Sequence, residues 1–503
     1  MRILFVKVCL TKGSSLGGLE NSVLEPLEFE YLAGAIPHHE VRCFDMRRER
    51  PAALQKLLES FDPQIVGSTA NTVDVYAVQS LFRLVKSYGR NILTVVGGYH
   101  ATYRPEDFNT PETDVIVQGP GEHTFRALVD RYEKNGCEFA DIAGLMIPRD
   151  GKLFQTARRP LAAIDSVQPD RRIAQKYRKS YHCEFWMPCA MVRNTFGCNY
   201  RCNFCALWTL GDGDLWERDV EKLCDEIESL PEEYVFFCDD LSFGLKSGLR
   251  MERFCQEMKR RNLKKKFYFT CRSDVVARMP ALIEKLCEAG MKRMFMGLEA
   301  YNDEGMEYWN KHNRARSNED AVALLHSHGV DITGSFLITP DFSERQFEEL
   351  FAYVDRLNIL CPAFLIYTPH PGVSVHEEKG FGQISENYEF YDHLHTLFAT
   401  AMPEKEFYRY FSDLWKRAYS PLCRTGYKRF WRIVSRISLP LLPHTLTMGF
   451  TIFRRMAQGN SVMERYQEGM MSNSGRARLA PVITVPLVEL TAGKQDPVER
   501  SVQ

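Results

Sequence analysis

Three cysteines stand close together near the middle of the chain, at Cys198, Cys202 and Cys205. Thiolates at this Cys-x3-Cys-x2-Cys spacing can each bind one iron of a four-iron cluster and leave the fourth iron without a protein ligand. A structural zinc site instead closes its shell with a fourth Cys or His at short range, and the next residues, Ala206 to Thr209, supply none. We therefore predict an iron–sulfur cluster here, in preference to a zinc site or to three buried structural cysteines.

The length and the charge of the chain set the context for this site. A chain of 503 residues exceeds what one hydrophobic core usually organises, so two or three domains are expected. The formal net charge of −1 gives no argument for nucleic acid as a partner. The other cysteines mostly stand singly in apolar stretches, Met1 to Val8 has a strand pattern instead of a signal peptide, and no apolar run is long enough to span a membrane. These features predict a reduced, cytoplasmic protein.

The N-terminal region, residues 1–140, alternates short apolar runs with helical patterns. This rhythm is typical of a doubly wound parallel sheet, which belongs to the α/β class. Such sheets bind ligands at the carboxyl ends of their strands. The residues there include several glycines, which let a large ligand approach the backbone closely. The ligand residues predicted at these strand ends are Ser68, Thr69, Gly97, Gly98, Tyr99, His100, Gly119, Gly121 and Glu122.

Residues 141–188 are predicted to be a connector that begins with a β-hairpin around Asp150-Gly151. A second alternating series follows in residues 189–375. With the strand before Cys198 it predicts six strands, which form a partial barrel of βα units with its active site at the carboxyl ends of the strands. Polar residues gather at these ends, and four of them are site candidates: Asp239, Asp240, Arg272 and Glu299. Each could singly be a helix cap, but their succession along one rim favours a site.

Residues 376–470 have a mainly helical pattern, with helices predicted from Tyr388 to about Arg417 and from Lys428 to Ile437. The second helix places Arg429, Arg432 and Arg436 on one face, and the apolar run Leu446–Phe453 with Arg454 and Arg455 follows it. Two interpretations stay open. The region is either an interfacial membrane segment or a lid helix docked on the barrel. Residues 471–503 mix glycine, serine, proline and charge, and are predicted to be a loosely ordered tail.

The three-cysteine motif, with the aromatic Phe204 just before the third cysteine, resembles the signature of the radical S-adenosylmethionine (radical SAM) superfamily. The resemblance implies a 4Fe–4S cluster held by Cys198, Cys202 and Cys205, whose open iron binds S-adenosyl-L-methionine (SAM) and reduces its sulfonium. It also implies that Phe204 packs near the adenine and that Glu299 binds the methionine ammonium group. Arg272 would then pair with the methionine carboxylate or a ribose hydroxyl, and Asp239 and Asp240 would bind ribose or substrate.

The N-terminal region is similar to the cobalamin-binding domain that precedes many radical SAM domains. The similarity rests on the order of elements, on Leu24-Glu25-Pro26-Leu27, on Gly97 to His100 and on Gly119 to Glu122. One departure concerns the cobalt. The Asp-x-His-x-x-Gly loop that supplies a histidine in many cobalamin domains is replaced after the first strand by Thr11-Lys12-Gly13-Ser14-Ser15. His100 is the nearest histidine in the ligand loops, and we expect no protein histidine on the cobalt.

Together these resemblances imply a cobalamin-dependent radical SAM methyltransferase that methylates an unactivated carbon of a small-molecule or lipid substrate. The helical, basic and apolar C-terminus resembles that of the methylases acting at C-3 of hopanoid lipids. The resemblance further implies an electron donor such as flavodoxin or ferredoxin, and peripheral attachment at the inner face of the membrane if the C-terminal segment contacts lipid.

Three alternatives remain open at this point. One is a non-methylating cobalamin-dependent enzyme that catalyses an oxidative cyclisation or a rearrangement. Another is a methylase of an antibiotic precursor or peptide. A third, less favoured, is a non-catalytic iron–sulfur protein, which would not need the polar rim of the barrel. Methylthiolation of transfer RNA is disfavoured, because those enzymes carry further cluster cysteines in the N-terminal domain, where Cys9, Cys43 and Cys137 stand far apart.

Overall fold

The apolar runs of the N-terminal region form a seven-stranded sheet in the computed structural model, which describes residues 1–9, 22–134, 136–373 and 383–443. The strand order is β3-β1-β4-β5-β6-β7-β8, and the first five strands are parallel. Because the order reverses between β1 and β4, the ligand crevice of this sheet lies at their carboxyl ends. The strands are β1 (Arg2–Lys7), β3 (Glu40–Asp45), β4 (Ile65–Thr69), β5 (Leu93–Gly97), β6 (Val115–Val117), β7 (Leu145–Arg149) and β8 (Lys152–Gln155).

Helices cover both faces of this sheet, as the doubly wound pattern predicts. Side chains of α2 and α3 pack with one set of strand residues, and side chains of α1 and α5 pack with the other set. The helices are α1 (Leu27–Ala35), α2 (Pro51–Phe61), α3 (Val75–Tyr88), the short α4 (Tyr99–Tyr103) and α5 (Glu122–Glu133).

The hairpin predicted at the start of the connector is part of the sheet. β7 pairs antiparallel with β6 through Leu145 and Val117, and β8 continues the sheet from β7. β6 would otherwise present unpaired backbone groups at the edge of the sheet. The sheet is therefore mixed at this edge, and it includes part of the segment 141–188 that the sequence assigned to a connector.

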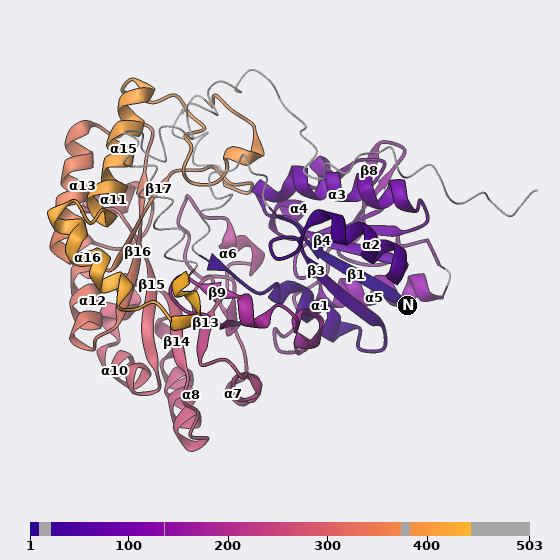
Figure 1. Ribbon diagram of the computed structural model, residues 1–503, viewed down its shortest axis with the longest axis horizontal. Helices are drawn as coiled ribbons and strands as arrows, with labels where there is room; N and C mark the ends of the chain where they lie inside the picture. The colour runs from indigo at the N-terminus through magenta and orange to yellow at the C-terminus, as the bar shows by residue number, and fades with distance from the viewer. Residues whose placement is uncertain (10–21, 135, 374–382, 444–503) are drawn as a thin grey trace, which may run out of the picture.

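The second domain is a partial barrel of six parallel strands in the order β10-β13-β14-β15-β16-β17, as predicted. Figure 1 shows it beside the N-terminal sheet. One continuous core fills the space between the strands and the outer helices. The strands are β10 (Cys189–Val192), β13 (Tyr234–Phe237), β14 (Lys266–Arg272), β15 (Met291–Glu299), β16 (Asp331–Ile338) and β17 (Cys361–Ile366). The helices are α6 (Leu207–Leu210), α7 (Val220–Ser229), α8 (Gly248–Arg260), α9 (Ser273–Arg278), α10 (Pro280–Glu288), α11 (Asp303–Tyr308), α12 (Ala315–Ser327) and α13 (Glu344–Leu357).

Two small antiparallel pairs complete the domain junction: β2 (Ser22–Val23) with β9 (His182–Cys183), and β11 (Thr195–Phe196) with β12 (Trp216–Glu217). Buried ion pairs of the connector hold the two domains together. Arg171 contacts Glu25 at 2.8 Å, just before α1, and also reaches Glu226 on α7 of the barrel. A buried arginine with carboxylates from both domains fixes their relative position, because breaking such a pair leaves a charge unpaired in the interior.

The C-terminal region corrects the predicted start of its first helix. Tyr388–Phe390 is only a 3₁₀ turn, η6, and the helix α15 spans Glu404–Tyr419. Pro403 directly precedes α15, and the residue before a proline is disfavoured in helical conformation. The segment before Pro403 instead packs between the two domains, where Tyr391, Leu397 and Phe398 join a mixed aromatic cluster.

The second C-terminal helix, α16 (Arg424–Val434), docks on the barrel, and the arginines of the predicted basic face contact the protein. Buried Arg429 donates to the carbonyl oxygens of Ile359 and Ala418, both at 2.8 Å. Arg432 donates to Asn358, and Arg436 pairs with Asp331 at 2.7 Å. Asp331, Asn358 and Ile359 lie at the amino ends of β16 and β17, and Ala418 lies on the neighbouring α15. The arginines therefore dock α16 on the end of the barrel opposite the predicted site, so the helix is neither a lid over that site nor a free basic surface.

Within the described ranges no helix is both long enough and apolar enough to cross a membrane. The predicted segment Leu446–Phe453, with Arg454 and Arg455, the tail 471–503 and the loop at Thr11–Ser15 all lie outside the described residues.

Candidate active site between the two domains

The cluster loop follows β10, and backbone hydrogen bonds to two aspartates hold its base. Asp239 accepts from the N–H groups of Asn194 and Thr195 at 2.7 and 2.9 Å, and Asp240 accepts from Gly197 N–H at 3.2 Å. Asp239 and Asp240 stand at the end of β13, as predicted. They bind the backbone that enters the three-cysteine motif, so their main contact in this structure is with the loop itself.

Gly197 is required where the loop begins. Its φ of +79° lies in the left-handed region, and a Cβ there would meet Asp214 O at 2.6 Å. A side chain would therefore be both strained and blocked by backbone.

The three thiols of this loop are buried or half-buried, and their surroundings suit a metal cluster. Burial raises the pKa of the Cys205 thiol to about 12, and nearby Cys202, Asp240 and Cys198 raise it further. Arg272 Nη1 lies 3.4 Å from Cys202 Sγ. Without a metal these thiols stay protonated. When positively charged iron binds them it displaces the protons, and the thiolates that result are its ligands. Cys198, Cys202 and Cys205 can thus hold the three protein-bound irons of a 4Fe–4S cluster.

Burial also raises the pKa values of the two aspartates beside the loop. The pKa of Asp239 is raised to about 6, and that of Asp240 to about 7, where the neighbouring Asp239 adds to the effect. Two carboxyl groups with raised pKa values in one buried corner are typical of a functional site.

Glu299 at the end of β15 has an unusual backbone. Its φ is +60°, and the pairing of β15 with β16 shifts register between Gly297 and Glu299. A non-glycine residue in this conformation costs about 1–3 kcal/mol and is usually retained for function. The bulge turns the carboxylate toward Lys311, whose Nζ lies 2.8 Å from Oε1.

Lys311 is a site residue that the sequence analysis missed. Its side chain is 3% exposed, and its ammonium group also donates to the carbonyl oxygen of Gly297. A Cβ at Gly297 would lie 2.1 Å from Glu299 Oε1 and 3.0 Å from Lys311 Nζ. The glycine therefore leaves the space in which this buried ion pair forms.

Arg272 at the end of β14 connects this pair to the cluster loop. It donates to Asp274 at 2.9 Å and to the backbone oxygen of Lys311, and its guanidinium lies 3.7 Å from the centre of the Tyr200 ring. Most of its donors are thus used by the protein itself. Arg272 therefore holds the loop and places positive charge beside Cys202 Sγ. Few of its N–H groups remain free to bind the carboxylate of a ligand.

Phe204 faces the region between the two domains. Its ring meets Trp309 edge-on at 5.5 Å, and the neighbouring Asn203 donates to Tyr308 O at 2.9 Å. Phe204, Tyr308 and Trp309 belong to the mixed aromatic cluster, which we define as these three residues packed with Leu337, Tyr367, Tyr391, Leu397, Phe398 and the tyrosines of α4. The place predicted for the adenine is therefore lined by aromatic and aliphatic side chains.

The residues predicted for cobalamin divide into two groups. Gly98 has a φ of +99°, and Gly119 has a φ of +68° with open space around it, so both supply backbone that only glycine adopts readily. Ser68 instead donates to Val6 O at 2.8 Å inside the sheet. Thr69 and Gly97 remain at the strand ends beside Gly98 and Val117, and Gly121 packs on Leu32.

His100 is turned into the domain, away from the ligand loops. It is fully buried, and its Nε2 lies 2.8 Å from Asp107 Oδ2. Its ring also meets Tyr388 edge-on at 4.7 Å. His100 is thus held inside the fold by Asp107 and Tyr388, and a contact with cobalamin stays a prediction.

Helix α4 brings the two predicted cofactor sites into direct contact. Tyr99 donates to Pro371 O at 2.7 Å, on the loop after β17, and Tyr103 donates to Ala206 O at 3.0 Å, next to the third cluster cysteine. A Cβ on Gly372 would lie 2.8 Å from the Tyr103 ring. The ligand loops of the N-terminal sheet therefore touch the cluster loop itself.

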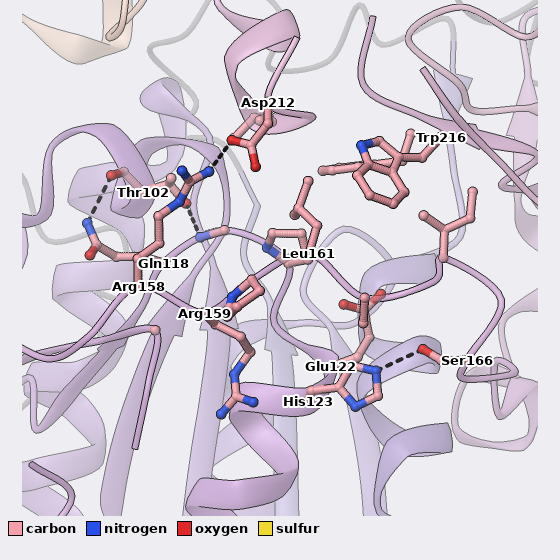
Figure 2. Close-up of a pocket in the computed structure, with 18 of the residues that line it drawn as sticks. Thr102, Gln118, Glu122, His123, Arg158, Arg159, Leu161, Ser166, Asp212 and Trp216 are labelled. Carbon is pink, nitrogen blue, oxygen red and sulfur yellow. Dashed lines mark hydrogen bonds and ion pairs between the residues drawn. The ribbon is translucent and has the colours of Figure 1, made fainter. Parts of the chain in front are cut away.

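A pocket of about 410 Å³ lies beside Tyr103. Figure 2 shows residues that line it, among them Glu122, Arg158 and Arg159. Its wall contains Gly119 and Glu122 together with Arg158 and Arg159 of the connector. Glu122 pairs with Arg193 at 2.9 Å, across the domain junction. Although burial acts to raise it, the Arg193 guanidinium holds the pKa of Glu122 below its usual value. Two arginines and a glycine-rich rim suit a large ligand with amide and phosphodiester groups, which is the chemistry of cobalamin.

The comparisons with known proteins agree with this division of the chain. Residues 21–129 match the B12 binding domain, and residues 193–354 match the radical SAM superfamily. Among curated proteins the chain is similar to the hopanoid C-3 methylase of Methylococcus capsulatus, at 25% identity over 76% of this chain and 74% of that protein.

Two solved structures share the fold. The radical SAM methyltransferase TsrM of Kitasatospora setae, with cobalamin and a [4Fe-4S] cluster bound, matches with a TM-score of 0.61 at 17% identity, over 82% of this chain and 88% of that chain. The cobalamin-dependent radical SAM enzyme OxsB, with aqua-cobalamin and SAM bound, matches with a TM-score of 0.60 at 18% identity, over 72% of this chain. This chain spans about half of OxsB, 53% of its length.

The two domain matches and the site geometry assign a 4Fe–4S cluster, SAM and cobalamin as the cofactors. The cluster thiols stand in the loop after β10 and β11, Glu299 and Lys311 stand on the rim of the barrel, and Tyr103 of α4 contacts Ala206 beside the third cysteine. The chain therefore joins a B12-binding domain to a radical S-adenosylmethionine domain, and it is similar to cobalamin-dependent radical S-adenosylmethionine methyltransferases.

Proposed function

We propose that the protein methylates an unactivated carbon of a polycyclic lipid, with C-3 of a hopanoid as the specific candidate. The observation that carries the proposal is the mixed aromatic cluster, which lies where the cluster loop, the rim of the barrel and α4 meet. Trp309 and Tyr367 pack at 5.2 Å, and Tyr367 stacks on Phe398 at 6.0 Å. Flat aromatic walls of this kind suit a rigid, largely apolar ring system. The similarity to a hopanoid C-3 methylase supports the same substrate class.

The bound cofactors would supply a one-electron route to a carbon radical and a methyl group to transfer to it. The residues of this chain would bind and orient SAM and the substrate and shield them from water. Glu299, held by Lys311, offers a carboxylate to the methionine ammonium group of SAM, and Phe204 offers a ring edge to its adenine. The contacts of Tyr99 and Tyr103 keep water out of the region between the domains, which matters because water and oxygen quench reactive intermediates.

A deletion strain and its parent, both grown on methionine with a deuterated methyl group, test the proposal. We expect the parent to contain a lipid with an intact CD₃ group that is missing from the deletion strain and returns with a plasmid copy. High-resolution mass spectrometry of lipid extracts measures it. An oxidative cyclisation would instead change the hydrogen and oxygen count of a metabolite without adding label, and that result would exclude methyl transfer. Turnover in vitro would need an external one-electron donor such as flavodoxin or ferredoxin, as the proposal includes.

Peripheral attachment to a membrane is part of the proposal, on a different surface from the arginines. Around α16 four large apolar side chains are exposed: Leu422 (80%), Tyr427 (53%), Trp431 (53%) and Leu439 (83%). Side chains of this kind insert at the headgroup boundary of a bilayer. In this proposal these four side chains and the exposed Lys428 contact the membrane, in place of the arginine face that the sequence predicted.

We expect the triple variant Leu422→Ser, Trp431→Ser and Leu439→Ser to lower flotation with anionic liposomes by about tenfold or more, because each buried apolar side chain contributes ~1.5–3 kcal/mol. Leu249→Ser, at an 85% exposed position on α8, is the matched control and should float like the parent. A parent protein that does not float, or a triple variant that floats equally well, would remove the membrane from the proposal.

A further inference from the structure

Two buried polar atoms near the end of β17 lack a hydrogen-bond partner among the described residues: the hydroxyl of Tyr367 and Nδ1 of His393. Tyr367 is 1% exposed and belongs to the mixed aromatic cluster. Buried polar atoms are paired in the great majority of proteins, and each exception calls for an explanation such as a ligand. Tyr367 directly follows β17, and the backbone of His393 contacts the last residue of β17, so both atoms belong to residues at the same strand end.

The position of His393 is fixed by backbone contacts. Its carbonyl oxygen accepts from Ile366 N–H, the last residue of β17, at 2.7 Å. Its φ is +63°, a conformation that only a few per cent of non-glycine residues adopt. Strained backbone of this kind clusters at ligand sites. His393 thus belongs to the rim of the barrel, although it comes from the C-terminal region.

His393 forms a pair with His370. The two Nε2 atoms lie 3.0 Å apart, so one ring donates a proton and the other accepts it. The His370 ring meets Tyr99 edge-on at 6.3 Å, and its centre lies 6.1 Å from that of the tilted Tyr391 ring. Tyr99 belongs to the cobalamin-side helix α4, and Tyr367, three residues before His370, packs on Trp309 beside Phe204. The pair therefore lies between the two cofactor sites, where a substrate must lie for both cofactors to act on it.

The charge state of the pair limits what it can bind. Burial lowers the pKa of His370 to about 3, and the neighbouring His393 and His100 lower it further. Burial also lowers the pKa of His393, against the opposing fields of Asp392 and Glu299. Both rings are neutral near pH 7. Neutral imidazoles and a phenol offer hydrogen bonds without a counter-charge, which disfavours a carboxylate or phosphate group.

We propose that Tyr367 and the His370–His393 pair form a polar subsite that hydrogen-bonds one uncharged oxygen or nitrogen group, such as a hydroxyl or a carbonyl, on the substrate. This inference rests on the proposed methyl transfer and narrows its substrate class. The substrate is an apolar ring system with a neutral polar group, and a pure hydrocarbon would leave both atoms unpaired. Such a site discriminates strongly against an analogue that lacks the group, because its own polar atoms then stay buried without partners.

The first test needs no substrate. Tyr367→Phe removes only the hydroxyl, so the purified protein should melt at the same temperature as the parent or higher if that hydroxyl has no partner. Tyr419→Phe is the matched control, because its buried hydroxyl donates to Pro362 O at 2.7 Å at the far end of the barrel. It should melt at a lower temperature than the parent. A comparable loss at Tyr367 would show that its hydroxyl is already paired, and would overturn the subsite.

The second test uses cells that produce the full chain and grow on CD₃-labelled methionine. We expect the labelled product to contain a hydroxyl, carbonyl or other neutral polar group by its exact mass and fragmentation. Tyr367→Phe should lower its amount about five- to tenfold, while the affinity of the anaerobically purified variant for SAM, measured by equilibrium dialysis, stays unchanged. His393→Asn, which tolerates the same backbone and keeps a hydrogen-bonding side chain, should retain more product than His393→Leu.

Each other outcome decides against the inference. A labelled hydrocarbon product, or equal product from the parent and Tyr367→Phe, would overturn the subsite and leave methyl transfer intact. Weaker SAM binding by Tyr367→Phe would assign these atoms to SAM instead. If the parent makes no labelled product at all, the proposed function fails, and the inference fails with it.

Discussion

Replacing any one of Cys198, Cys202 and Cys205 by Ala should reduce the cleavage of SAM by the anaerobically purified, chemically reduced protein to an undetectable level. The loop supplies three thiols, one for each protein-bound iron of the cluster. Loss of one ligand therefore leaves a cluster that cannot keep both its irons and its open site. The measurement is iron and sulfide content together with chromatography of the adenosyl product.

Cys287→Ala is the matched control for these variants. Cys287 lies on the outer helix α10 of the same domain, away from the cluster loop, so iron content and SAM cleavage should equal those of the parent. Stoichiometric zinc in protein produced anaerobically with iron, or full cleavage activity in any of the three loop variants, would contradict the assignment of the cluster.

Lys311→Met should produce the largest loss of stability among single substitutions at the site. The substitution leaves Glu299 buried without its counter-charge, and breaking a buried ion pair from one side costs about 3–5 kcal/mol. For a domain of this size that loss lowers the melting temperature by roughly 6–20 °C. The double variant Lys311→Met, Glu299→Gln should recover much of the loss, because no unpaired charge remains, while its affinity for SAM stays weak.

An exposed ion pair of the same domain provides the control for Lys311. Arg345 pairs with Glu349 along α13 at 2.6 Å, and the arginine is 85% exposed. Arg345→Met should leave the melting temperature nearly unchanged, since exposed pairs contribute little. If Lys311→Met melts like the parent, the buried pair does not form in solution. If the double variant binds SAM as tightly as the parent, Glu299 is not part of the SAM site.

Much of the fold follows from local patterns in the sequence. Runs such as Ile65–Ser68 and Asp331–Ile338 are rich in β-branched and aromatic residues between helical patterns, so strand positions and the parallel arrangement were predictable. The site residues at the strand ends followed from that arrangement, because parallel strands bring their carboxyl ends to one rim.

Lys311 and His393 could not be predicted in the same way. Lys311 comes 12 residues after Glu299, in a loop without periodicity, and only the need of a buried carboxylate for a counter-charge hinted at it. His393 was hidden inside a segment expected to be helical from Tyr388, where Pro403 was the overlooked signal. The arginines of α16 do share one face, as the helical period predicted. Which surface that face meets is decided by contacts distant in the chain, such as Asp331 with Arg436.

The position of α16 separates anchoring from catalysis in space. The helix covers the amino ends of the barrel strands, whereas the cluster loop and the aromatic cluster lie at their carboxyl ends. The eight residues of β16 alone span about 26 Å, and an interfacial helix enters a bilayer by only about 5–10 Å. If the protein is attached to a membrane through α16, the carboxyl ends of the barrel strands, where the cluster loop lies, face the aqueous phase. Its lipid would have to arrive there already extracted, handed over by a carrier or presented by a neighbouring enzyme, so delivery and chemistry would be separate events.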